Sequence, residues 1–359
     1  MLSLINSTNH MSLRCISRLK MEKLISSWVN NQSVPESYIF PLEKRPSDVA
    51  VPTSNKIPVV DLGGVHCRGC DQAQVINQIL RASEEFGFFQ LVNHGVPEKT
   101  IHDVMSVAEE FFEMPVEERA KLYSDDRNQI VRVNTSIDYN NEDVHFWREN
   151  LRHPCHPLEK FVHLWPEKPS RYRDVIGTYS VEVRGLALRI LELICEGLGL
   201  ERDYFSNGLG STQLMSINHY PKCPDPTLTL GLPKHCDPNV ITLLLQGEVC
   251  GLQVFKDGEW MAVEALPNAF VVNLGQQMQI ISNGQLKSVE HRVVTNSTAS
   301  RTTIVTFIHP DNGSIIAPAS TLVDVRSPPL YRAFQFQDFL SAHFEKSGDK
   351  ESTLELFKL

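Results

Sequence analysis

The chain has 359 residues, of which 42% are hydrophobic and 21% are charged, and its formal net charge is −9. This length and composition are typical of a soluble globular protein with one large core and an appended helical part. The acidic balance argues against a nucleic-acid partner or an anionic membrane surface, because either would favour a basic face. No stretch approaches the roughly 18 consecutive apolar residues that a membrane-spanning helix requires.

Eight cysteines are scattered without the dense spacing of a disulfide-stabilised protein, so we expect reduced thiols and a cytoplasmic location. Cys67 and Cys70 form a Cys-x-x-Cys pair, but no second ligand pair at zinc-site spacing accompanies them. A plain loop is therefore the expectation there. The acid-free segment 1–20 is compatible with a transit peptide or with an upstream extension before Met21, and its low arginine content favours the extension.

The first half of the chain alternates short apolar runs with amphipathic segments. Strands are predicted where apolar residues cluster between turn residues, and helices where apolar residues recur at a spacing of three or four. Gly197 and Gly199 mark the end of the longest predicted helix, which follows a polar, irregular segment at 124–145. In chain order we expect a strand at 57–62, a helix at 72–86, a strand at 87–95, a helix after Pro97 and a helix at 171–196.

After residue 210 the pattern changes to many short apolar or alternating runs divided by Pro, Gly, Asn and Asp. Such a series of short strands predicts a sandwich or a barrel. The stretch KDGEW at 256–260 has the Asp-Gly pair of a tight hairpin turn. A helix is expected again at 336–346. The fold class is therefore mainly β, with flanking helices and a helical N-terminal part.

The stretch LPKHCDPNV at 232–240 places three good metal ligands side by side. Side chains alternate between the two faces of a strand, so His235 and Asp237 point the same way and Cys236 points to the other side. Two ligands do not complete a site. The best candidate for a third is His291, which lies on a predicted strand further along the chain.

Two imidazoles and one carboxylate on one side of a metal form the facial arrangement of non-haem Fe(II) oxygenases. The absence of a thiolate ligand disfavours a structural zinc site. A 2-oxo acid co-substrate would chelate such an iron, and its distal carboxylate would need a cation. Arg301 is a plausible partner, because a guanidinium binds a carboxylate bidentately. Thr303 could add a hydroxyl to the same face, and Tyr220 could add a phenol.

These motifs resemble the plant 2-oxoglutarate- and Fe(II)-dependent dioxygenase superfamily, whose pattern is His-x-Asp, a distant His, and Arg-x-Ser. The resemblance extends over nearly the whole chain. It is carried by HCD, by His291, by RTT, and by the strings IPVVDL, EEFGFFQLVNHGV, AEEFFEMPVEE, NHYPKCPDP and GLQVFKDGEWMAV. The resemblance implies a double-stranded β-helix (jelly-roll) core.

The resemblance also implies roles for individual residues and an activity. It implies Fe(II) ligation by His235, Asp237 and His291, and 2-oxoglutarate binding by Arg301, Thr303, Tyr220 and Asn218. Thr303 stands where the family usually has Ser, and His219 replaces a common aromatic residue. The implied activity is hydroxylation by O2, coupled to decarboxylation of 2-oxoglutarate to succinate, with ascorbate as a supporting reductant.

The expected division of the chain follows the same resemblance. The segments are an N-terminal arm at 1–55, an N-terminal dioxygenase domain at 56–160, a long helical connection at 161–210, the catalytic core at 211–312 and a helical tail at 313–359. No feature requires an oligomer, so we expect a monomer.

The substrate is expected to be a small specialised metabolite that is hydroxylated, epoxidised or desaturated. Parts of the chain are similar to hyoscyamine 6-hydroxylase-like enzymes, and others to downy-mildew-resistance-type salicylate hydroxylases and flavone synthases. A protonated amine would favour a carboxylate or an aromatic box in the pocket. The variable stretch IVRVNTSIDYNNED begins without an acid, which weakens the alkaloid alternative. An inactive β-barrel binding protein and a zinc hydrolase are rival functions, but the first should have lost a ligand and the second lacks an obvious general base.

Overall fold

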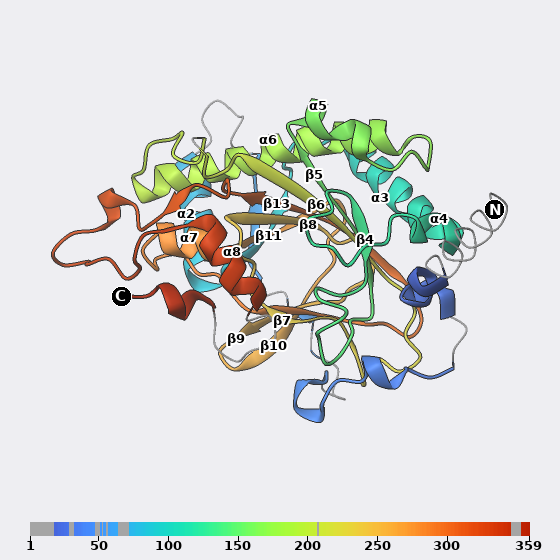
Figure 1. Ribbon diagram of the computed structural model, residues 1–359. Coiled ribbons are helices and arrows are strands. Elements are labelled where there is room, and N and C mark those ends of the chain that lie inside the picture. The colour runs from blue at the N-terminus through green and yellow to red at the C-terminus, as the bar shows by residue number, and fades with distance from the viewer. Residues whose placement is uncertain are drawn as a thin grey trace, which may run out of the picture.

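In the computed structural model, the described residues are 18–28, 32–46, 51, 53–54, 57–63, 72–206, 208–345 and 353–359. The Cys-x-x-Cys pair and most of the acid-free segment 1–20 lie outside these residues, so the expectations for them stay predictions. Figure 1 shows two principal sheets, with the long helix α6 (Tyr172–Leu198) across one side of the larger sheet. Among the helices within the described ranges, none combines the length and the apolar character that a membrane span needs.

The larger sheet takes strands from both halves of the chain. They are β2 (Val59–Asp61), β3 (Phe88–Val92), β4 (Arg132–Asn134), β5 (Glu149–His156), β6 (Thr212–Tyr220), β8 (Ile241–Leu245), β11 (Phe270–Leu274) and β13 (Arg301–His309). Their order across the sheet is β2-β3-β11-β8-β13-β6-β5-β4. Strands that are far apart in the sequence therefore become neighbours, and the N-terminal strands extend the sheet at both edges.

The smaller sheet covers one half of the larger one. Its strands are β1 (Thr53–Ser54), β7 (Leu230–His235), β9 (Leu252–Lys256), β10 (Glu259–Val263) and β12 (His291–Val294), in the order β1-β10-β9-β12-β7. Between the two sheets lies an apolar cluster that includes Leu244 and Val305 from the larger sheet and Val254 from the smaller one. Burial of the inner faces of two packed sheets is the arrangement expected of a jelly roll, which confirms the predicted fold class.

Helices α2 (Gln72–Glu85), α3 (Glu98–Glu113) and α6 cover the outer face of the larger sheet, where the main apolar core lies. Ile79, Val104 and Ile190 lie in this core together with sheet residues such as Leu243. The α-helices are α2 (Gln72–Glu85), α3 (Glu98–Glu113), α4 (Val116–Ala120), α5 (Leu158–Phe161), α6, α7 (Gln276–Ile281) and α8 (Phe336–Glu345). The 3₁₀ turns are η1 (Ile25–Trp28), η2 (Glu36–Tyr38), η3 (Leu42–Lys44), η5 (Val162–Leu164), η6 (Ser320–Leu322) and η7 (Thr353–Phe357), and a short ribbon pairs β14 (Ile315–Ile316) with β15 (Phe334–Gln335).

Two turn predictions are confirmed. Gly199 follows α6 with a left-handed φ of 70°, and its amide N–H donates to carbonyls of the last helical turn. Asp257 and Gly258 have φ values of 52° and 86° between β9 and β10. Positive φ at both central residues is the signature of the type I′ hairpin turn, which Asp-Gly favours.

Strand β5 forms in spite of two prolines near its end. Pro154 and Pro157 in RHPCHP would favour a rigid loop, but Glu149–His156 form strand β5. Pro154 is accommodated because β4 pairs with β5 only as far as Arg152, so this part of β5 has no β4 partner for a backbone N–H to bond. This strand matters for the site, because alternate side chains of β5 lie on the side of the larger sheet that carries the predicted co-substrate residues.

Candidate functional site

The predicted metal ligands meet where the ends of two strands of the smaller sheet lie together. His235 ends β7 and lies directly opposite His291, the first residue of β12. The His235 and His291 Nε2 atoms lie 3.6 and 3.7 Å from Asp237 Oδ1. One donor atom from each of the three residues lies within 4.8 Å of the others, a spacing that suits one shared ion. His235 and Asp237 therefore point the same way, as strand alternation predicted, and His291 joins them.

Hydrogen bonds hold the two imidazoles in the same tautomer. His235 Nδ1 lies 2.8 Å from the Pro233 carbonyl oxygen, and His291 Nδ1 lies 3.1 Å from that of Val289. A carbonyl can only accept, so each Nδ1 carries a proton, and in the neutral ring Nε2 then keeps its lone pair. Burial, together with the neighbouring His235, lowers the pKa of His291 to about 4. A neutral imidazole is the form that binds a metal.

The Asp237 carboxylate is oriented by two groups that the sequence interpretation missed. Its Oδ2 accepts hydrogen bonds from Thr242 Oγ1 at 2.6 Å and from Asn273 Nδ2 at 2.8 Å. Burial alone would raise the pKa of Asp237, but the nearby histidines and the Thr242 hydroxyl hold that pKa well below its usual range. The carboxylate is thus ionised, and Oδ1 is the oxygen that faces the two imidazoles.

Cys236 lies between two members of this group but does not belong to it. Its Sγ turns toward the carbonyl oxygen of Ser288, 3.9 Å away. Burial raises the pKa of the Cys236 thiol to about 12, so the side chain stays protonated and is a poor metal ligand.

The predicted co-substrate residues lie on β13 and β6 of the larger sheet. Arg301 pairs with Tyr220, and Thr303 pairs with Asn218, so all four share one side of the sheet. Arg301 Nε donates to the Val249 carbonyl at 2.8 Å, and its guanidinium lies 5.4 Å from the centre of the Tyr220 ring. Within the described residues no carboxylate pairs with Arg301, which is 4% exposed. A buried guanidinium without a counter-ion is suited to bind an anion.

Asn218 is engaged by neighbours on β5. Its side-chain oxygen accepts from Asn150 Nδ2 at 2.8 Å and from Arg148 at 3.2 Å. Tyr331 and Phe334, two aromatic residues late in the chain, lie in the main apolar core.

Comparison with known proteins decides the family. A model described as the 2OG-Fe(II) oxygenase superfamily matches residues 211–310, and one described as non-haem dioxygenase in morphine synthesis N-terminal matches residues 57–168. Protein DMR6-LIKE OXYGENASE 2 of Arabidopsis thaliana is 46% identical over 329 residues, which are 90% of this chain and 94% of that protein. The chain belongs to the 2OG-Fe(II) oxygenase superfamily.

Other relatives of this oxygenase are named for different activities. Hyoscyamine 6-dioxygenase of Hyoscyamus niger is 40% identical, covering 94% of this chain and 99% of that protein. Flavanone 3-dioxygenase 2 of Oryza sativa subsp. japonica is 42% identical, covering 94% and 98%. The crystal structure of JOX2 in complex with 2OG, Fe and JA has a TM-score of 0.82 and 33% identity, covering 92% and 95%.

These comparisons confirm the predicted superfamily, its jelly-roll core and its dependence on Fe(II) and 2-oxoglutarate. The protein is a 2-oxoglutarate-dependent dioxygenase with a small-molecule substrate. The donor set fits the metal, because two imidazole nitrogens and one carboxylate oxygen suit a non-haem Fe(II). The expected division of the chain into five segments stays a prediction.

Proposed function

We propose that His235, Asp237 and His291 hold the Fe(II) of this dioxygenase. The convergence of two Nε2 atoms on Asp237 Oδ1 is the observation that carries this assignment. Each remaining donor atom of the three side chains is already hydrogen-bonded to the protein. The ligands would therefore occupy one side of the ion and leave the other side for 2-oxoglutarate and O2.

We propose that Arg301 anchors the distal carboxylate of 2-oxoglutarate. Its buried guanidinium has N–H groups beyond the one that binds Val249, and it lies beside the Tyr220 ring. Thr303, two residues along the same strand, offers its hydroxyl on the same side of the sheet. Asn218, opposite Thr303, would help to orient the co-substrate.

When bound, Fe(II) and 2-oxoglutarate together supply the oxidising chemistry that hydroxylates a C–H bond and releases succinate and CO2. The protein orients these reactants and keeps the His291 imidazole neutral. It also surrounds the site with buried side chains, since His291 and Asp237 are only 7% and 5% exposed. Exclusion of water prevents unproductive side reactions.

The substrate in this proposal is a small plant specialised metabolite, in keeping with the relatives, whose names include hyoscyamine and flavanone dioxygenases. Hydroxylation is the expected outcome, with epoxidation or desaturation as variants of it. We further propose that the protein works as a monomer in the cytoplasm, without a nucleic-acid or membrane partner. Its acidic net charge of −9 supports the absence of polyanionic partners.

Anaerobic titration tests the assignment of the metal ligands. Addition of Fe(II) and 2-oxoglutarate to the full chain should produce a visible metal-to-ligand charge-transfer band, and the band should be absent in His235→Ala. Admission of O2 with a panel of alkaloids, flavonoids and phenolics should release succinate together with an oxidised product. A wild-type protein with neither a band nor succinate release would refute the proposal.

A further inference from the structure

A cavity of about 280 Å³ lies between strands β4, β5 and β6 and the C-terminal helix α8. Arg132 of β4 and Arg152 of β5 line one part of it, and Leu214 of β6 and Phe344 of α8 line another. The sequence analysis did not identify this cavity.

The cavity is connected to the metal ligands through one row of the larger sheet. Pro154 and Leu214, which line the cavity, pair with each other, and Leu214 pairs with Phe307. Phe307 pairs in turn with Thr242, whose hydroxyl binds Asp237. With neighbouring strands about 4.8 Å apart, the three steps from β5 to β8 span roughly 14 Å. A small metabolite of that length would reach from the cavity at one end to the metal ligands at the other.

The C-terminal end of helix α8 lies near both the cavity and the metal ligands. Phe344 lines the cavity, and the guanidinium of Arg127 lies 5.0 Å from the centre of its ring. The preceding residue, His343, lies within electrostatic range of His235 and Asp237, and burial lowers its pKa to about 4. The end of α8 thus lies between the metal ligands and the cavity.

Two arginines of the cavity, Arg132 and Arg152, lack carboxylate partners among the described residues. Arg132 and Arg152 are directly opposite each other on β4 and β5. Within the described chain neither guanidinium has a carboxylate at ion-pair distance, and the acids that act on Arg132 from further away are Asp125 and Asp126. Burial, together with the charges of Arg132 and Arg148, lowers the pKa of Arg152 to about 9. Like charges directly opposite on neighbouring strands are destabilising, so an anion between them would relieve a cost of folding.

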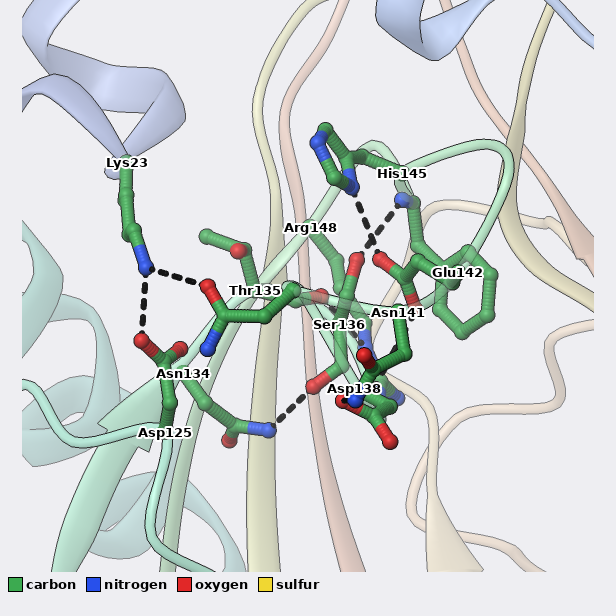
Figure 2. Close-up of polar contacts among 12 residues, drawn as sticks. Lys23, Asp125, Asn134, Thr135, Ser136, Asp138, Asn141, Glu142, His145 and Arg148 are labelled. Carbon is green, nitrogen blue, oxygen red and sulfur yellow. Dashed lines mark hydrogen bonds and ion pairs between the residues drawn. The ribbon is translucent and has the colours of Figure 1, made fainter. Parts of the chain in front are cut away.

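Internal contacts hold Arg127, at the rim of the cavity, and the neighbouring loop after β4 in place without a ligand. Arg127, at the rim, is ion-paired to Asp138 at 2.9 Å. Figure 2 shows the loop that follows β4, in which the Asn134 side chain donates to the Ser136 carbonyl and Arg148 reaches the Thr135 carbonyl. Residues held in this way lose little further entropy when a ligand binds.

We propose that the cavity is the substrate subsite and that Arg132 and Arg152 bind a carboxylate of the substrate, whose apolar body lies along Leu214 and Phe307 toward the metal. The substrate is thus an apolar or aromatic organic acid rather than a protonated amine. This inference rests on the proposed function, because it takes the metal site as the place of oxidation. A paired guanidinium contact to a carboxylate is strong and directional.

Two probes of nearly the same shape test the charge requirement, namely trans-cinnamate and its neutral amide trans-cinnamamide. Each is titrated by calorimetry into the full chain under anaerobic conditions, with and without Fe(II) and 2-oxoglutarate. We expect wild type to bind cinnamate at least about tenfold more tightly than cinnamamide, as a charge-assisted pair requires. Arg152→Gln and Arg132→Gln should each remove most of that preference and leave the affinity for cinnamamide unchanged.

Arg184→Gln is the matched control. Arg184 is another partly buried arginine, but it lies on α6 and donates to the Gly210 carbonyl. This variant should keep the full preference for cinnamate. Both cavity variants should fold, because they remove a repulsive pair, and urea denaturation checks that.

The outcomes separate this inference from the proposed function. Four results would overturn the carboxylate subsite. Wild type could bind the two probes equally, bind neither, or bind inorganic phosphate more tightly than cinnamate. Arg152→Gln could also lose affinity for both probes equally. Loss of the 2-oxoglutarate charge-transfer band in Arg152→Gln would also overturn it, since the cavity would then serve the co-substrate. A preference for cinnamate in a wild-type protein that shows no such band would instead refute the proposed function alone.

Discussion

The hydroxyl of Thr242 should control how tightly the protein binds iron. Thr242 Oγ1 donates to Asp237 Oδ2 at 2.6 Å and accepts from Asn239 Nδ2 at 2.9 Å. Thr242→Val keeps the shape of the side chain and removes only this hydroxyl. Asp237 would keep one hydrogen bond, from Asn273, and its carboxylate would be free to rotate about that contact.

The size of the effect follows from the charge of the acceptor. A hydrogen bond to a charged group is worth about 1.5–3 kcal/mol. Since about 1.4 kcal/mol corresponds to a tenfold change, the Kd for Fe(II) should rise by about 10- to 100-fold, the range usual for partners that orient a metal ligand. The assay is anaerobic Fe(II) titration at saturating 2-oxoglutarate, followed by the visible charge-transfer band.

Thr302→Val supplies the comparison. Thr302 is also buried on the larger sheet, but its hydroxyl lies 3.0 Å from His219 Nδ1 on the opposite face. This variant should lose some stability and keep its affinity for Fe(II). If Thr242→Val binds Fe(II) within twofold of wild type, the reasoning that the hydroxyl orients Asp237 is refuted.

Further substitutions probe the remaining parts of the site and its scaffold. Cys236→Ser should leave Fe(II) binding nearly unchanged and Asp237→Ala should abolish it, both measured by the same titration; loss of metal in the cysteine variant alone would show that the alternation argument is wrong. Arg301→Gln should weaken 2-oxoglutarate binding by about tenfold or more while Fe(II) still binds, as calorimetry would show; unchanged affinity would remove Arg301 from the co-substrate site. Gly275→Ala should destabilise the fold by about 3 kcal/mol in urea denaturation, because an added Cβ would overlap a backbone carbonyl, whereas Gly185→Ala on α6 meets nothing within 4 Å and should stabilise the helix by up to about 1 kcal/mol. Equal stability of these two glycine variants would contradict the packing argument.

The convergence of two candidate metal ligands, His235 and Asp237, could be predicted from the sequence because a local rule determines their geometry. Alternation along a strand places His235 and Asp237 on one side, and it continues to hold although β7 ends at His235 and Asp237 lies just beyond it. His291 was predicted from chemistry alone, and the register of β12 against β7 supplies the reason, since the two histidines are direct partners.

The groups that support the ligands could not be predicted in this way. Thr242 and Asn273 reach Asp237 only because β8 and β11 pair in a register that makes these two residues direct neighbours. Register is set by tertiary packing rather than by local sequence. Arg152 was missed for a different reason, because prolines usually interrupt strands and this one lies beyond the end of its β4 partner. The alternation of Arg148, Asn150 and Arg152 was the signal that could have revealed β5.

Different parts of the two sheets carry the proposed metal site and the arginine cavity. The proposed iron ligands and their supports come from β7 and the turn after it, β8, β11 and β12, whereas the arginine cavity is built by β4, β5, the loop before β4 and the tip of α8. Changes in these peripheral segments can alter which molecule is accepted without disturbing the strands that hold the metal. The same oxidising centre can therefore be kept in related proteins while the substrate differs. Relatives named for molecules as different as hyoscyamine and flavanone are an example.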